Sequence, residues 1–374
     1  MTRATRADLE LIKIHALSRG LRIADGALTS LGGSSALTVH EYSTTGGITL
    51  VLPEDVYVNA PFDDWFAAES ELLLNIQEGR FRLSLGEIEV EPKRILPLPS
   101  FLETEDSKGR PVRDTVMSHA DRIRVSPIAG CAYDCAFCDL TGLPYRRRPI
   151  DQLLEAIKIA AADETLPVRH LLISGGTAAG RETDQLYFRQ VCREIIGCYA
   201  GVSPALEVDI MMPGRADAPA FMQEMVEAGV HGFALNLELF SATASQIHTR
   251  LKFRHARPHL ESTIKAAVEL LGRGTGRVRS LIVVGLEPID ETLAGVEWLA
   301  RLGCDPVLSP FRPAAGTPLA RVGPPSVAQL RNLLAAARSI ASNEGVSLGP
   351  ACVACQHNTL TFPWDVVTVA NKGD

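Results

Sequence analysis

The sequence predicts an α/β protein whose central part is a partial (βα)6 barrel. From about residue 122 onward, short apolar runs alternate with amphipathic stretches of helical length, and the pair repeats six times. Strands that alternate with helices form parallel sheets, because parallel neighbours need crossover connections. The apolar runs are all too short to span a bilayer, so we expect no membrane partner.

The strands and helices of the barrel can be assigned in order. The expected strands are residues 122–127, 169–174, 206–212, 232–239, 278–285 and 306–310. The expected helices are residues 151–162, 184–198, 218–228, 258–271, 291–302 and 326–342. In the first helix Leu153, Leu154 and Ile157 share one apolar face. In such barrels the loops that follow the carboxyl ends of the strands form the functional site.

The ends of the chain have a different pattern. Residues 1–115 are expected to form a β-rich or mixed extension, with a helix near residues 7–19 and alternating apolar segments at 48–52, 56–58 and 81–90. Within it, residues 97–114 have the prolines and charges of a linker. The barrel itself is expected to span residues 116–345. Residues 346–374 then form a C-terminal segment that contains a C-x-x-C pair.

Composition narrows the possible partners. The formal net charge of −7 provides no basic surplus for phosphates, which argues against nucleic acid as a main partner. The first twenty residues lack the apolar stretch of a secretory signal, so we expect a cytoplasmic protein. The eight cysteines are unevenly distributed, with three of them inside residues 131–138. In a reducing compartment this distribution favours metal chemistry over disulfides.

Cys131, Cys135 and Cys138 directly follow the first expected barrel strand. Their spacing allows three thiolates to converge on one side of a loop, and thiolates are the ligands of iron–sulfur clusters. A four-iron cubane held by three thiolates keeps one iron open to a small chelating ligand. The alternative is a structural zinc loop or a redox site. A zinc loop needs a fourth ligand nearby, and the next histidine, His170, lies on the second expected strand.

These cysteines, with Phe137 between the last two, fit the pattern C-x-x-x-C-x-Φ-C, in which Φ is aromatic. The chain thereby resembles the radical S-adenosylmethionine (SAM) superfamily, most closely its biotin synthase, methylornithine synthase and hydrogenase maturase group. The resemblance implies a TIM-like partial barrel and a [4Fe–4S] cluster on the three cysteines. It also implies that SAM chelates the open iron and is reductively cleaved, with an electron donor such as flavodoxin or ferredoxin.

The resemblance further implies which residues contact the cofactors. Family members use a glycine pair after the second strand, often followed by Glu where this chain has Thr177. They also use a polar residue after the fourth strand, an arginine on the following helix and backbone groups after the fifth strand. The corresponding positions here are Phe137, Gly175, Gly176, Thr177, Glu238, Arg254 or Arg257, and Gly285. Without that role the glycine pair is a plain turn, and one of the two arginines is a solvated helix residue.

Three further residues are candidates for the reaction itself. Arg312, after the sixth strand, is expected either to project toward the substrate cavity or to lie at the surface beside a turn. Cys352 and Cys355 can help to bind a second cluster with Cys304 or His357, or can cycle as a dithiol. With Cys304 they can also bind a thiophilic centre such as arsenite. The remaining alternative is that they are buried, reduced thiols.

The expected function is that of an enzyme on a small-molecule substrate. The main hypothesis is hydrogen abstraction by a 5′-deoxyadenosyl radical made from SAM. A second hypothesis is cleavage of another carbon–sulfur bond with transfer of the 3-amino-3-carboxypropyl group, for instance to thiol-bound arsenic. A third, from a different class, is a metal-binding or cluster-binding scaffold without catalysis.

Overall fold

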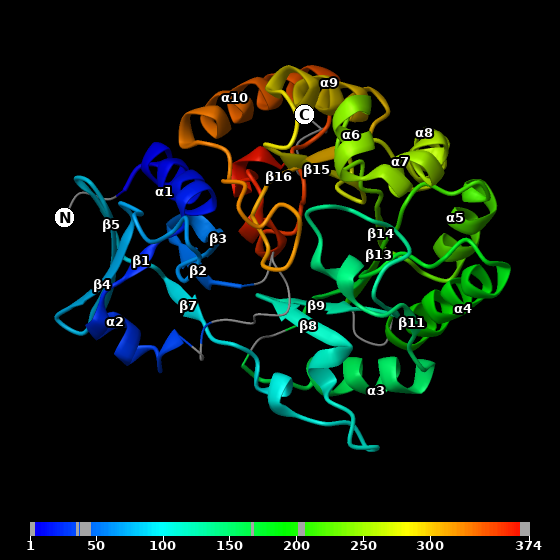
Figure 1. Cartoon of the computed structure of the whole chain (residues 1–374), viewed down its shortest axis with the longest axis horizontal. Coiled ribbons are helices and arrows are strands. Elements are labelled where there is room, and N and C mark those ends of the chain that lie inside the picture. The colour runs from blue at the N-terminus through cyan, green and yellow to red at the C-terminus, as the bar shows by residue number, and fades with distance from the viewer. Residues whose placement is uncertain (1–3, 35–36, 38–45, 166–167, 201–205, 367–374) are drawn as a thin grey trace, which may run out of the picture.

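A curved seven-stranded sheet forms the centre of the molecule. The structure is a computed structural model that describes residues 4–34, 37, 46–165, 168–200 and 206–366. The strand order is β16-β15-β14-β13-β12-β9-β8. The parallel strands are β9 (Arg122–Val125), β12 (His170–Ile173), β13 (Glu207–Met211), β14 (Gly232–Ala234), β15 (Val278–Val284) and β16 (Asp305–Pro310). At one edge β8 (Val116–His119) pairs antiparallel with β9. The sheet curls into an open barrel, which confirms the expected fold class (Figure 1).

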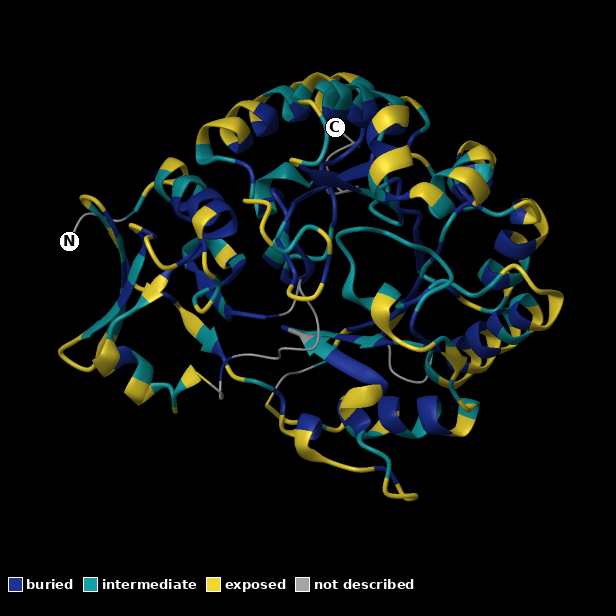
Figure 2. Ribbon diagram, in the orientation of Figure 1, coloured by how far each residue is buried: buried dark blue, intermediate teal, exposed yellow. Residues whose placement is uncertain are grey.

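Helices cover the outside of this sheet. They are α3 (Ile150–Ala161), α4 (Glu182–Tyr199), α5 (Ala218–Glu227), α8 (Arg257–Leu271), α9 (Ile289–Arg301) and α10 (Val327–Glu344). Each helix buries the face toward the sheet and exposes the opposite one, as expected from amphipathic sequences (Figure 2). Two short helices that the sequence analysis did not predict, α6 (Ala242–His248) and α7 (Arg250–His255), lie between β14 and α8.

The fourth barrel strand ends five residues earlier than expected. Beyond Ala234, side chains replace part of the backbone ladder: the Leu237 N–H donates to Ser280 Oγ at 3.0 Å, and the Leu281 N–H donates to Asn236 Oδ1 at 3.4 Å. Pairing resumes at an isolated bridge between Glu238 and Ile282, and Glu238 has a φ of 68°. The interruption therefore turns the chain where Glu238 lies.

The N-terminal extension contains helices and two small sheets. Its helices are α1 (Arg6–Arg19) and α2 (Asp25–Ser30). One sheet has the order β1-β4-β5-β6 and the other β3-β2-β7. Their bounds are β1 (Arg22–Ile23), β2 (Ile48–Leu52), β3 (Val56–Ala60), β4 (Leu73–Gln77), β5 (Arg80–Leu85), β6 (Ile88–Val90) and β7 (Arg94–Leu96). The segment expected as one strand at 81–90 is a hairpin, because Gly86, at a φ of 58°, turns the chain.

The extension packs directly against the barrel and the C-terminal segment. Helix α1 lies against α10, and β3 lies against the short 3-10 helix Ala354–Asn358 (Figure 1). The buried Lys13 of α1 donates from Nζ to the carbonyls of Gln356 and Thr361, at 2.9 and 2.5 Å. Across the described ranges, none of the helices combines the length and apolar character needed to cross a bilayer.

Candidate functional site

The three-cysteine loop lies at the carboxyl ends of the barrel strands. It connects β10 (Ile128–Ala129) with β11 (Arg146–Arg147), which pair antiparallel beside the end of β9. All three thiols are partly exposed, unlike the buried Cys192 and Cys304. The loop therefore presents its sulfur atoms at the end of the barrel where such folds bind their ligands.

The loop after β12 fixes Cys131 from one side. The backbone N–H groups of Thr177 and Tyr133 point at Cys131 Sγ, at 3.2 and 3.4 Å, and Ala132 N–H donates to the Thr177 carbonyl at 3.1 Å. Gly176 permits this approach, because a Cβ atom there would lie 1.6 Å from the Gly130 carbonyl oxygen. Gly176 is thus required for the close packing of the two loops.

Helices α6 and α7 fix the other side of the cysteine loop. The Ala136 N–H donates to the His248 carbonyl at 2.7 Å. Asp134 accepts from the Leu251 N–H at 2.8 Å and from the Arg250 guanidinium at 3.1 Å. The sequence analysis did not single out Asp134, although it lies inside the cysteine motif. The loop is therefore tied to two different elements before any metal binds.

Burial raises the pKa of the Cys135 thiol and raises that of Cys138 to about 12, so both are protonated in the metal-free chain at neutral pH. Metal binding must displace these protons. In the described part of the chain, the trio of metal-binding side chains whose ligand atoms all lie within 4.8 Å of one another is His170, Cys352 and Cys355. The sulfur atoms of Cys131, Cys135 and Cys138 are therefore spread more widely than 4.8 Å. Sulfur ligands of a single zinc ion are roughly 3.8 Å apart, given zinc–sulfur bonds of about 2.3 Å. The wider spread favours ligands of separate irons in a cluster.

A cavity of about 630 Å³ opens beside the cysteine loop. Its walls come from the loops after β12, β13 and β14 and from helix α7. Among the residues that line it are Tyr133, Gly175, Gly176, Thr177, Asn236, Glu238, Lys252, His255 and His259. The volume lies within the range of roughly 300–1,000 Å³ that is typical of small-molecule sites. Of the expected cofactor contacts, four are in this wall: Gly175, Gly176, Thr177 and Glu238.

Glu238 forms an ion pair with Lys252 inside this cavity. Lys252 Nζ lies 2.7 Å from Glu238 Oε1, and both side chains are 14% exposed. The charges of both groups act on the Cys135 thiol, so the pair lies close to the cysteine loop. Lys252 was not among the residues predicted for this site. Its spacing of three residues to His255 on α7 is a local signal, because residues three apart in a helix are neighbours on its surface, and both residues line the cavity.

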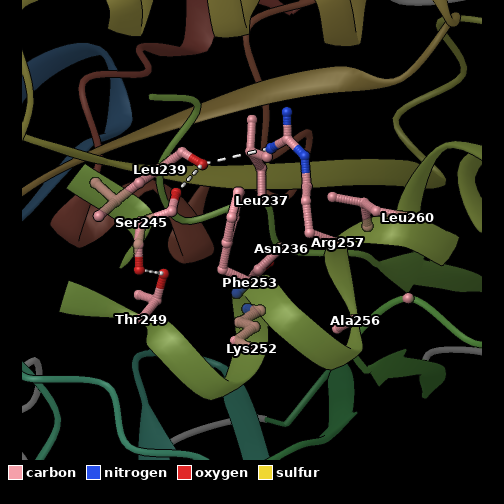
Figure 3. Close-up of a pocket in the computed structure, with 11 residues that line it drawn as sticks. Asn236, Leu237, Leu239, Ser245, Thr249, Lys252, Phe253, Ala256, Arg257 and Leu260 are labelled. Carbon is pink, nitrogen blue, oxygen red and sulfur yellow. Dashed lines mark hydrogen bonds between the residues drawn. The ribbon is translucent and has the colours of Figure 1, made fainter. Parts of the chain in front are cut away.

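The two arginines expected at the cofactor do not line this cavity. Arg257 packs over Phe240 and Trp298, 5.3 and 5.0 Å from the ring centroids. Its guanidinium donates to the Leu239 carbonyl at 3.4 Å (Figure 3). Arg254 is exposed on α7. Arg257 shares a separate, small pocket with Lys252 (Figure 3), but neither arginine lines the larger cavity, which corrects the expectation for both.

Phe137 and Gly285 have packing roles. The partly buried Phe137 lies against an apolar cluster that includes Leu239, Val283 and Phe311. Gly285 has a φ of 105° and packs against the ring of Pro325, with a virtual Cβ only 3.0 Å from its Cδ. Neither residue lines the cavity beside the cysteine loop. Phe137 instead helps to hold the cysteine loop on the strand ends.

Arg312 contacts the N-terminal extension. Its guanidinium donates to the Gly46 carbonyl at 2.5 Å, to Asn59 Oδ1 at 3.2 Å and to Asp64 Oδ2 at 2.7 Å. The side chain is 14% exposed. The structure corrects both sequence expectations, because Arg312 neither lines the cavity nor lies free at the surface. It is an anchor between the barrel and the extension.

The C-terminal cysteines lie at the other end of the barrel. Cys355 Sγ is 3.3 Å from Nδ1 of His170, the first residue of β12. Ser174, at the cavity, follows His170 by four positions along the strand, which corresponds to roughly 13 Å at a rise of about 3.3 Å per residue. Cys304 is fully buried in the main core and is not part of this group. The expected trio of Cys304, Cys352 and Cys355 is therefore corrected: His170 takes the third place.

Comparison with known proteins identifies the central part of the chain. Residues 125–305, which contain the cysteine loop and the four parallel strands β12 to β15, match the Radical SAM superfamily. This part of the chain is a radical SAM domain. Members of the radical SAM family are enzymes that bind a [4Fe–4S] cluster and SAM, and these groups are accordingly the cofactors of this chain. No curated protein matches the chain.

Solved structures with a similar chain path include several radical SAM proteins. HydG, a maturase of the [FeFe]-hydrogenase, is 13% identical with a TM-score of 0.47, and the match covers 65% of this chain and 56% of HydG. Methylornithine synthase is 16% identical with a TM-score of 0.44, covering 66% and 79%. A radical SAM methyltransferase from Sphaerobacter thermophilus is 19% identical with a TM-score of 0.42, covering 68% and 79%. This chain thus matches little more than half of HydG.

The residues beside the cavity fit the two cofactors. Three thiols on one loop, two backbone N–H groups aimed at Cys131 and an adjoining cavity of small-molecule size suit a cluster with an open iron. The Lys252 and Glu238 pair places charges of both signs in the wall of this cavity. The three thiols and the adjoining cavity are thus both compatible with a cluster that binds SAM.

Proposed function

We propose that the chain holds its [4Fe–4S] cluster on Cys131, Cys135 and Cys138 and converts SAM to a 5′-deoxyadenosyl radical that abstracts hydrogen from a small molecule. One observation carries this proposal: the cysteine loop borders a cavity of about 630 Å³ that also presents Gly175, Thr177 and Glu238. A cavity of this size suits a cofactor and a small substrate better than a macromolecule.

The backbone around Cys131 prepares the site for a negatively charged cluster. When bound, the cluster supplies the electron that breaks a carbon–sulfur bond of SAM. The N–H groups of Thr177 and Tyr133 donate toward Cys131 Sγ and so stabilise charge on the sulfur. Hydrogen bonds to cluster sulfurs are one of the means by which a protein sets the reduction potential. A ferredoxin or flavodoxin is the kind of reductant that the site requires.

Lys252 and Glu238 are the proposed contacts for the amino acid part of SAM. The Lys252 ammonium can pair with the carboxylate of SAM, and Glu238 can accept hydrogen bonds from its amino or ribose groups. Both side chains are largely shielded from water, which strengthens such contacts. Gly175 and Gly176 bring backbone groups to the same wall. Thr177 provides a hydroxyl where family members often have a carboxylate.

The alternative of aminocarboxypropyl transfer to a thiol-bound arsenic has less support. It required three thiols near the cavity, and Cys352 and Cys355 lie at the amino ends of the strands with a histidine as their third neighbour. Radical hydrogen abstraction is therefore the preferred reaction.

The test is mass spectrometry of the SAM-derived product. The anaerobically reconstituted chain is reduced with dithionite in the presence of SAM, and the Cys135→Ala variant serves as the inactive control. We expect 5′-deoxyadenosine from the wild type and none from the variant. Formation of 5′-methylthioadenosine in its place would support aminocarboxypropyl transfer and refute the proposal. No SAM-derived product from a fully loaded cluster would refute both reactions.

A further inference from the structure

A buried group of metal-binding side chains lies at the amino ends of the barrel strands, away from the cysteine loop. It consists of His170, Cys352 and Cys355. Within the described residues this is the one trio of histidine, cysteine or acidic side chains whose ligand atoms all lie within 4.8 Å of one another. Its members come from positions far apart in the sequence, since His170 begins β12 and the cysteines flank the start of a 3-10 helix.

The spacing of this trio suits a single tetrahedral ion. Nδ1 of His170 lies 3.3 Å from Cys355 Sγ. Ligand atoms around zinc are roughly 3.6–3.8 Å apart, given zinc–sulfur bonds of about 2.3 Å and zinc–nitrogen bonds of about 2.0–2.1 Å. Small movements of the side chains therefore bring all three atoms onto an ion. A second four-iron cluster needs more thiolates than these two, and the described structure adds no third cysteine to the group.

A second layer of contacts orients His170. Its other ring nitrogen, Nε2, lies 2.9 Å from Asp209 Oδ2. Asp209 is held in turn by Arg279 at 2.7 Å and by His231 Nδ1 at 3.1 Å, and its side chain is 2% exposed. Histidines that bind metals almost always donate their second N–H to a carboxylate, a backbone carbonyl or a water molecule. The arrangement directs Nδ1 of His170 toward the two sulfur atoms.

We infer that His170, Cys352 and Cys355 bind a zinc ion that fastens the C-terminal segment across the amino ends of the barrel strands. Two soft thiolates with one imidazole are a typical zinc donor set. Asp121 is the candidate for the fourth position, because its charge acts on Cys355 and its buried Oδ1 has no hydrogen-bond partner among the described residues. Its carboxylate lies outside the 4.8 Å group and has to move in to reach the ion.

The inferred zinc ion has a structural role. The same segment is tied to the N-terminal extension through Lys13, so the ion would lie where three parts of the chain meet. Structural zinc contributes directly to folding free energy. Its site is separate from the cavity of the proposed reaction, so that either can fail without the other.

The test is elemental analysis of the full chain after anaerobic purification. It is performed on the wild type and on a variant in which Cys131, Cys135 and Cys138 are all alanine, which removes the proposed cluster. We expect about one zinc per chain in both. Cys352→Ser or His170→Ala should lose the zinc, whereas Cys198→Ser, at an exposed site on α4, should retain it.

Two further measurements sharpen the result. Zinc-edge X-ray absorption should show two sulfur ligands and one imidazole nitrogen. Asp209→Asn should weaken zinc binding by roughly 10–100-fold in competition with a chromophoric chelator. An unchanged zinc affinity in that variant would contradict the orienting role of Asp209. Should the His170 variant fail to fold, cobalt substitution of the triple-alanine variant, which lacks the thiols of the cysteine loop, decides. A thiolate-to-cobalt charge-transfer band supports the site, and its absence refutes it.

Three outcomes would overturn the inference. The first is a zinc-free wild type whose Cys352 and Cys355 form a disulfide or remain free thiols. The second is iron with sulfide in the triple-alanine variant that disappears with Cys352→Ser, which would show a second cluster. The third is zinc that remains after both Cys352 and Cys355 have been replaced.

Discussion

Gly176→Ala should separate the two loops that build the cofactor site. The new Cβ would lie 1.6 Å from the Gly130 carbonyl oxygen and 3.1 Å from Cys131 Cα, while ordinary contacts begin at 3.4 Å. The loops must therefore move apart by about 1.8 Å, and both neighbours are backbone, which cannot rotate away. Overpacking of this kind costs about 1–3 kcal/mol or more. A misplacement of about 1 Å at a reacting centre can lower a rate by roughly 100-fold.

The assay compares iron and sulfide content, thermal unfolding and SAM cleavage in Gly176→Ala and Gly142→Ala. Gly142 follows the cysteine motif, does not line the cavity and has no atom within 4 Å of a virtual Cβ, so its variant should behave like the wild type. We expect Gly176→Ala to bind less iron and to cleave SAM at least about 100-fold more slowly. Full iron content with normal SAM cleavage in Gly176→Ala would refute the view that close loop packing positions Cys131.

Three more outcomes follow from the structure. Cys135→Ala should abolish cluster binding, measured as iron and sulfide content, whereas the control Cys198→Ala, at an exposed site on α4, should keep the cluster. A brown, active Cys135→Ala protein would contradict the ligand assignment. Lys252→Ala should raise the Kd for SAM by roughly 10–100-fold, because a hydrogen bond to a charged group contributes about 1.5–3 kcal/mol. The control Lys265→Ala, which changes a largely exposed side chain of α8, should leave the Kd unchanged. An unchanged Kd of Lys252→Ala in equilibrium dialysis would show that Lys252 does not contact SAM. Burial lowers the pKa of Lys13 from 10.5 to about 7, so between these pH values the unfolded chain binds more protons than the folded chain. The free energy of unfolding therefore rises with pH in that window, by at most about 1.4 kcal/mol per pH unit. Lys13→Met should remove this rise in denaturant titrations, and parallel curves for the two proteins would contradict it.

Much of the fold could be predicted because its signals are local. Apolar runs and amphipathic periods identify the strands and helices of the barrel, and the six expected helices lie within a few residues of the observed ones. The edge strand β8 and the short helices α6 and α7 were missed. Segments of four to seven residues contain too few periods for a pattern to be distinct.

The site was predictable where a motif is contiguous and was not where contacts are long-range. Cys131, Cys135 and Cys138 are close in sequence, so their spacing alone indicates a shared ligand. The partners of Arg312, by contrast, lie about 250 residues away in the extension, and nothing local reveals them. The pairing of His170 with Cys355 spans 185 residues and depends on how the barrel closes. Charge and spacing suggest such residues, and only the fold pairs them.

Cys131, Cys135 and Cys138 are proposed to hold a cluster with one iron open to SAM. Electron-nuclear double resonance on the reduced, reconstituted chain, with SAM labelled in its amino nitrogen and carboxylate oxygens, probes that contact. We expect magnetic coupling of both labels to the cluster, and we expect the signal to be lost in Cys135→Ala. A fully assembled cluster without coupling to either label would refute this arrangement.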